Sequence, residues 1–231
     1  MHLSYPQVIT VLAGVNSISK TGLGAFRARI RKLQGEGVPH GANPGKGKSV
    51  AYTLGMVVEL AIAIELIQCG FSPADAGGII KPIRSDVYWA ALMSLEKSED
   101  PDAEDPIILI SPESLMLYSR TTEVKDRSSV MAAASIVTRE IFLNIVANGS
   151  EFDPIIGVYW RWSFIDLKEL FKNIRNHSWD ALDREVDVDH YIESEIKNNE
   201  KELLSFKKEK LNNMMSWGGT YGGASLVKII S

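Results

Sequence analysis

The chain has 231 residues, of which 45% are hydrophobic and 23% are charged, as in ordinary soluble globular proteins. This composition excludes wholesale disorder, which needs low hydrophobicity and high net charge, and a collagen-like chain. The net charge of −4 is unevenly distributed. Residues 1–84 carry nine Lys and Arg against four Asp and Glu, a net of +5, and residues 85–231 carry sixteen against twenty-five, a net of −9. The asymmetry predicts a basic module that meets a polyanion, joined to an acidic module with another task.

The cysteine count and the termini bear on the compartment. Cys69 is the single cysteine, so no intramolecular disulfide forms and a reducing compartment is expected. The N-terminus lacks the basic stretch and apolar core of a signal peptide. The most apolar run, residues 54–67, contains two glutamates and is too short to span a bilayer. We therefore expect a cytoplasmic protein without a membrane segment.

The first third of the chain reads as a series of helices and one loop. Residues 7–15 are apolar and predict a helix, and a second follows in which Leu23, Phe26, Ile30 and Leu33 recur at helical spacing, as a buried stripe does. Gly35 and Gly37 end that helix. Residues 40–49, with three glycines, one proline and two lysines, predict a mobile basic loop.

Two further helices are expected after this loop. Residues 54–68 predict a long helix, stopped by a left-handed residue at Gly70. This helix would carry five apolar residues on one side, Val57, Leu60, Ala61, Ile64 and Ile67. Ser72 and Asp75 mark the start of the next helix, and Pro82 is expected to end it.

The remaining sequence is acidic and less regular. Residues 96–106 are charged, contain two prolines and predict a linker. Beyond it we expect strands over 107–110 and 115–118, and helices over 129–147 and 164–174. Residues 188–215 predict a long polar helix with apolar positions at roughly heptad spacing, which fits either a dimeric coiled coil or a helix packed on its own domain.

The second helix carries the main functional signal. Arg27 and Arg31 are four residues apart and share a face, and Arg29 and Lys32 flank it. Guanidinium groups on such a face reach base edges or phosphates in the major groove of DNA. Lys46 and Lys48 of the basic loop could follow the phosphate backbone as a wing. This order of elements predicts a winged helix-turn-helix.

Four sequence blocks carry a family resemblance. They are residues 20–23 (KTGL), which include Lys20, residues 36–39 (EGVP), Tyr52, and residues 69–76 (CGFSPADA) followed by two isoleucines. In this order they resemble the winged helix-turn-helix domain of the MerR-type transcriptional regulators, over residues 18–81. The resemblance implies DNA binding by a homodimer and places Lys20 beside the recognition helix. The C-terminal metal-binding cysteines of that family are absent, so no metal is expected.

The sequence contains no complete motif for nucleotide binding, metal binding or catalysis. Residues 41–49 nearly match a phosphate-binding loop, but Ala42 stands where its first glycine is needed. Asp183, Glu185, Asp187 and Asp189 lack the glycine turn of a calcium loop, and the four histidines show no ligand spacing. We expect no cofactor, no metal and no enzyme activity. A nucleotide-binding enzyme that uses the Gly-Lys loop stays open as an alternative.

Taken together, the sequence predicts a mainly α fold. A winged helix-turn-helix domain (1–95) and a linker (96–106) precede an acidic region (107–231) that is small α+β or α-helical, with a long terminal helix. The predicted function is sequence-specific binding of double-stranded DNA by a transcriptional regulator. The residues expected to bind DNA are Lys20, Arg27, Arg29, Arg31, Lys32, Lys46 and Lys48. The acidic region would dimerise or bind a small-molecule effector or a protein partner. A protein-interaction adaptor that keeps the domain without binding DNA is the other alternative.

Overall fold

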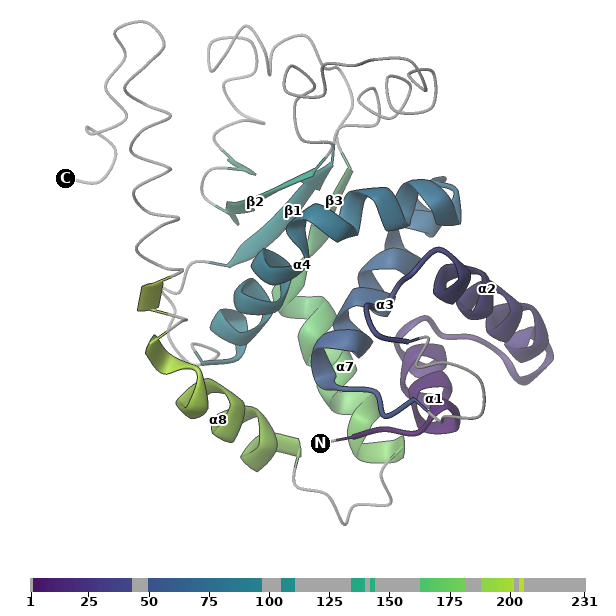
Figure 1. Ribbon diagram of the computed structural model, residues 1–231, viewed down its shortest axis with the longest axis horizontal. Coiled ribbons are helices and arrows are strands. Elements are labelled where there is room, and N and C mark those ends of the chain that lie inside the picture. Colours follow the sequence, from purple (N-terminus) through teal and green to yellow (C-terminus); the bar gives the residue numbers. More distant parts are fainter. Residues whose placement is uncertain are drawn as a thin grey trace, which may run out of the picture.

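A computed structural model describes residues 2–42, 50–96, 105–110, 134–139, 142–143, 163–181, 188–201 and 204–205. Within these ranges the protein is mainly helical, with a small three-stranded antiparallel sheet (Figure 1). The helices are α1 (Tyr5–Val15), the 3-10 turn η1 (Lys20–Gly22), α2 (Leu23–Gly35), α3 (Leu54–Gln68), α4 (Pro73–Glu96), α7 (Leu167–Ala181) and α8 (Val188–Asn198). The strands are β1 (Pro106–Ile110), β2 (Ala134–Thr138) and β3 (Ser163–Asp166).

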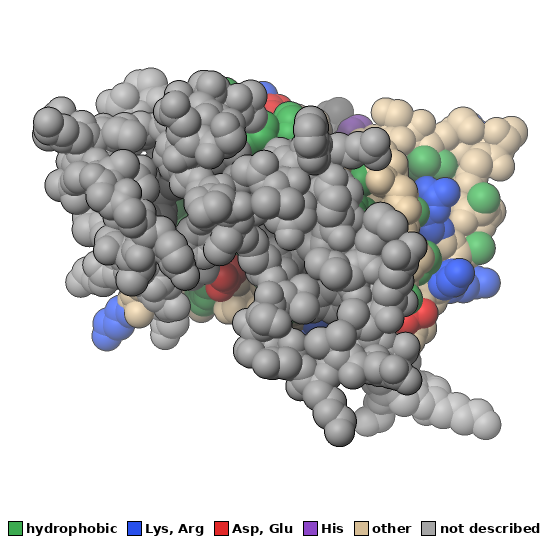
Figure 2. All heavy atoms as spheres, turned by 90° about the horizontal axis from the view of Figure 1, so that it is seen from above, with side chains coloured by type: hydrophobic (Ala, Val, Ile, Leu, Met, Phe, Trp, Pro, Cys, Tyr) green, Lys and Arg blue, Asp and Glu red, His purple; other side chains and the backbone are tan. Residues whose placement is uncertain are grey.

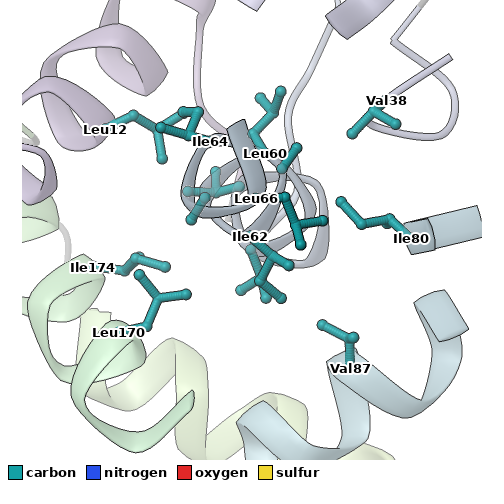
Figure 3. Packing of buried hydrophobic residues seen from close by; sticks show 14 of the residues in the cluster. Leu12, Val38, Leu60, Ile62, Ile64, Leu66, Ile80, Val87, Leu170 and Ile174 are labelled. Carbon is teal, nitrogen blue, oxygen red and sulfur yellow. The ribbon is translucent and has the colours of Figure 1, made fainter. Parts of the chain in front are cut away.

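Helix α3 occupies the centre of the hydrophobic core. The predicted stripe is largely buried, but Val58, Ile62, Ala63 and Leu66 are buried as well, and Ile67 is only partly so. Burial on α3 therefore extends beyond the one side that the sequence pattern marks. A helix that is apolar all round is typically enclosed by other elements, and Figure 3 shows α3 surrounded in this way.

The elements around α3 come from both ends of the chain. In Figure 3, Leu12 of α1, Ile80 and Val87 of α4, and Leu170 and Ile174 of α7 all approach α3. These residues belong to one hydrophobic cluster, although α7 follows the predicted linker and the other helices precede it. The division into two domains at 96–106 stays a prediction, and residues 97–104 of this segment lie outside the described residues.

A glycine allows α1 and α7 to pack closely. A Cβ atom at Gly14 would lie 2.5 Å from Nδ1 of His177 on α7. A separation this short is not possible between real atoms, so a side chain at Gly14 would push the two helices apart. The absence of a side chain at this position thus fixes how α1 sits on the C-terminal half.

Both glycine-terminated helices end as predicted. Gly37 after α2 and Gly70 after α3 have φ angles of 80° and 100°, in the left-handed region that glycine adopts without a steric penalty. In the second case the Phe71 N–H donates to the Leu66 carbonyl at 3.1 Å, the long hydrogen bond of a Schellman motif. Phe71 itself is buried, so the chain leaves α3 in one defined direction.

The start of α4 was predicted correctly and its end was not. The Ser72 hydroxyl contacts the Asp75 carboxylate at 2.6 Å, and the Asp75 N–H donates to that hydroxyl at 3.2 Å, which is a reciprocal cap. Pro82 lies inside α4 and does not end it. Buried residues on both sides of it, such as Ile80 and Val87, anchor both halves of the helix. The helix bends along its course (Figure 1), as expected at an internal proline.

The sheet has the order β2-β1-β3, and both pairings are antiparallel. Strand β1 is fully buried and agrees with the strand predicted over 107–110. The helix predicted over 129–147 is wrong over residues 134–138, which form β2, whereas the other described residues of this range, 139 and 142–143, are helical. This segment contains the β-branched residues Ile136, Val137 and Thr138, which favour strands, and it pairs with the buried β1.

Other C-terminal predictions are met only in part. The helix expected over 164–174 begins later, at Leu167, because 163–166 form β3. It also extends beyond the predicted end, to Ala181. Asp166, the last residue of β3, accepts the Glu169 N–H at 3.1 Å, as an N-cap does. Of the long helix predicted over 188–215, α8 covers Val188–Asn198. The strand predicted over 115–118 and residues 206–215 lie outside the described residues.

Candidate nucleic-acid interface

The turn between α1 and α2 is tightly defined by backbone hydrogen bonds. The Ile18 N–H donates to the Ala13 carbonyl at 2.8 Å and the Ser17 N–H to Gly14 at 3.0 Å. Ser17 adopts a φ of 50°, so a non-glycine residue takes the left-handed position that ends the helix. The 3-10 turn η1, which carries Lys20, then leads directly into α2. The result is two helices joined by one short, ordered connection.

One side of α2 is buried as the sequence predicts. Phe26 is 2% exposed, and Ile30 and Leu33 are completely buried. Leu23 packs against the same cluster and is partly buried. The stripe anchors α2 on the core, while the helix lies at the outer edge of the molecule (Figure 1). Its other side therefore faces outward.

The outward side of α2 and the preceding turn carry the predicted basic residues. Lys20, Arg27, Arg29, Arg31 and Lys32 are all exposed. Among the described residues, none of the five forms an ion pair with an acidic side chain, whereas Arg84, Arg139, Lys168 and Lys172 do. Figure 2 shows Lys and Arg side chains at the end of the molecule where α2 lies. We call these five residues the α2 basic surface.

The predicted wing is described only at its two ends. Lys46 and Lys48 lie outside the described residues, which stop at residue 42 and resume at 50. On the far side, Tyr52 forms a β-bridge with Leu3, with two backbone hydrogen bonds of 2.8 and 2.9 Å. Tyr52 is 1% exposed, and its hydroxyl accepts a hydrogen bond from Gln34 of α2. Burial raises the pKa of this hydroxyl.

A buried carboxylate fixes the near end of the same segment. Glu59 lies on α3 and is 6% exposed. Its Oε2 accepts the His40 N–H at 3.1 Å and lies 2.9 Å from Nε of Arg84 on α4. A charge at this depth is tolerated only with partners. Sequence reasoning missed Glu59, although a glutamate within an otherwise apolar helical run is a signal that could have found it.

Helix α8 packs on its own chain. The Glu195 carboxylate accepts the Tyr88 hydroxyl at 2.9 Å and also that of Tyr191, so it joins α8 to α4. Burial and the nearby carboxylate raise the pKa of both tyrosines. Ile192 is buried in the common core. The described apolar residues of α8 thus contact α4 and the core, which agrees with the second reading of the predicted long helix.

The described part of the chain contains no group of three or more His, Cys, Asp or Glu side chains that could hold a metal ion. None of its helices is long and apolar enough to cross a membrane. Residues 43–49, which include most of the Gly-Lys loop, lie outside it.

Comparison of the chain with protein-family models finds no match, and comparison with curated proteins finds none either. The likeness to MerR-type regulators therefore rests on the sequence blocks described above.

The role of Glu59 can be tested by substitution. Glu59→Gln keeps the shape of the side chain but removes the charge that pairs with Arg84 and accepts the His40 N–H. We expect the free energy of unfolding in urea to fall by about 1–3 kcal/mol.

Glu65→Gln, on the same helix, is the matched control. Burial raises the pKa of Glu65, so its charge disfavours the folded state above that pKa, and neutralising it at pH 7 should leave stability unchanged or slightly higher. Equal losses in both variants would contradict the role of Glu59.

Proposed function

We propose that the chain is a sequence-specific DNA-binding transcriptional regulator of MerR-like type, and that α2 is its recognition helix. The observation that carries the proposal is that α2 is amphipathic, with one apolar, buried side and one basic, exposed side. It buries Phe26, Ile30 and Leu33 and exposes the α2 basic surface, which no described acidic side chain neutralises. A polyanion is the partner that such a surface favours.

The spacing of residues on α2 fits insertion into the major groove. An α-helix turns by about 100° per residue, which places Gly24, Ala28 and Gly35 opposite the buried stripe. All three are exposed, and space is open around both glycines. This ridge of small residues would let the helix backbone approach the floor of the groove, which is about 12 Å wide.

The basic side chains flank this ridge. The same helical geometry puts Arg27 and Arg31 on one side and Arg29 and Lys32 on the other. Arg27 and Arg31 are separated by a rise of roughly 6 Å, which corresponds to about two base-pair steps. One pair can then read base edges while the other contacts phosphates, a division of labour typical of protein–DNA interfaces.

The segment between α2 and α3 would serve as the wing. Contacts of Glu59 and Tyr52 fix both ends of the segment that carries Lys46 and Lys48, and this supports a wing with a fixed base. With Lys20, these lysines would bind phosphates. In this proposal the protein acts in the cytoplasm as a homodimer. The acidic half provides the dimer contacts or binds an effector or a protein partner.

The basic residues can be tested by a double substitution. Arg27→Ala with Arg31→Ala should weaken binding to a duplex that the wild-type chain enriches from random sequences. The slope of log K against log salt should fall by up to about 2, because each lost phosphate contact releases roughly one counterion fewer. Fluorescence anisotropy at several salt concentrations measures both quantities.

The matched control is Lys197→Ala with Lys201→Ala. These lysines are also exposed and four residues apart, so the net charge changes equally at a site on or next to α8. This variant should bind nearly as the wild type does. If both double variants lose DNA affinity equally, the loss comes from the change in net charge and not from the position of the two arginines on α2. A wild-type chain without salt-dependent DNA binding would favour the adaptor alternative.

The ridge gives a sharper test that leaves every basic residue in place. Ala28→Glu puts a negative charge at the centre of the proposed contact and should weaken DNA binding by at least about tenfold, since like charges at an interface are costly. Ala28→Gln has the same size without the charge and should bind much more tightly than Ala28→Glu. If both variants bind DNA as the wild type does, α2 does not enter the groove.

A further inference from the structure

A surface hollow of about 310 Å³ lies at the junction of α1, η1 and α2. Ile9 and Ala13 of α1, Ile18 of the turn and Leu23 of α2 provide its apolar lining. Figure 1 shows α1 and α2 next to each other at this end of the molecule. The volume is at the lower end of the range for small-molecule sites.

Two cations complete the lining of this hollow. Lys20 and Arg27 line it, both are exposed, and its lining contains no acidic residue. Neither forms an ion pair with an acidic side chain in the part of the chain that the structure describes. A ligand that matches this combination has an apolar body and an anionic group, which two cationic donors would hold by charge-assisted hydrogen bonds.

We propose that this hollow binds a small apolar carboxylate, of about the size of an arylalkanoic acid. The carboxylate lies between Lys20 and Arg27, and the apolar body covers Ile18 and Leu23, the partly buried apolar residues of the lining. The DNA backbone fits the hollow less well, because phosphates and sugars are too polar to use its apolar lining. Binding at this site does not require DNA.

The site has a regulatory consequence that rests on the proposed function. Lys20 and Arg27 belong both to the hollow and to the α2 basic surface. A carboxylate that holds them withdraws them from DNA, so ligand and DNA binding oppose each other, and by linkage each weakens the other by the same factor.

The direct test uses the full chain with labelled isoleucine methyl groups and 4-phenylbutyrate as the probe. The probe should shift the methyl signals of Ile9 and Ile18 saturably and leave that of the core residue Ile62 unchanged. The neutral analogue 4-phenylbutan-1-ol should bind at least about tenfold more weakly, because it lacks the charge. No saturable shift, or equal binding of the alcohol, would overturn the proposal.

Three variants locate the site. Lys20→Gln with Arg27→Gln should weaken probe binding by at least about tenfold, and Arg29→Gln with Lys32→Gln, which changes charge equally outside the lining, should not. Thr10→Trp fills the hollow from an exposed position that lines it and should abolish binding. Equal losses in both charge variants, or unchanged binding in Thr10→Trp, would place the probe elsewhere.

A competition experiment separates this site from the proposed function. Saturating probe should weaken DNA binding by the wild-type chain but not by Thr10→Trp. If the probe binds and the chain has no affinity for DNA, the hollow is a carboxylate-binding site and the proposed function is wrong. If the chain binds both and neither affects the other, the regulatory consequence is wrong.

Discussion

Burial of α3 on all sides is the constraint on which the rest of the structure depends. Each fully buried Leu or Ile contributes about 1.5–3 kcal/mol relative to an exposed one, and Leu60, Ile62, Ile64 and Leu66 of α3 are all completely buried. Helices α1, α4 and α7 must pack around this element to keep it from water (Figure 3). The N-terminal helices and the C-terminal α7 are consequently parts of one packed cluster.

The same constraint shapes the candidate interface. Glu59 lies on the buried helix, so its carboxylate needs partners, and those partners hold the segment after α2 and the helix α4. Tyr52 connects the start of α3 to Leu3 and to Gln34 of α2. Because α2 is fixed by its apolar stripe and these contacts, its basic side stays outside. A surface held in this way is preordered, which lowers the entropic cost of binding a partner.

The features that sequence predicted correctly depend on neighbours along the chain. The stops at Gly37 and Gly70, the cap at Ser72 and the exposure of the arginines of α2 follow from backbone chemistry or from helical period, which act over a few residues. The failures depend on distant contacts. Helix α4 continues past Pro82 because buried residues on both sides of the proline pack on the core. Residues 134–138 form a strand because they pair with β1. The partners of Glu59 and the Tyr88–Glu195 contact join segments far apart in sequence, which no local pattern encodes.

The most direct test of the central claim is an amide NMR titration of the labelled chain with a mixed-sequence DNA duplex at low salt. If α2 enters the groove, signals of residues 20–35 shift progressively with added duplex, and those of α8 stay in place. Raising the salt concentration should reverse the shifts, because counterion release drives this binding. An unchanged spectrum, or shifts confined to α7 and α8, would contradict the account.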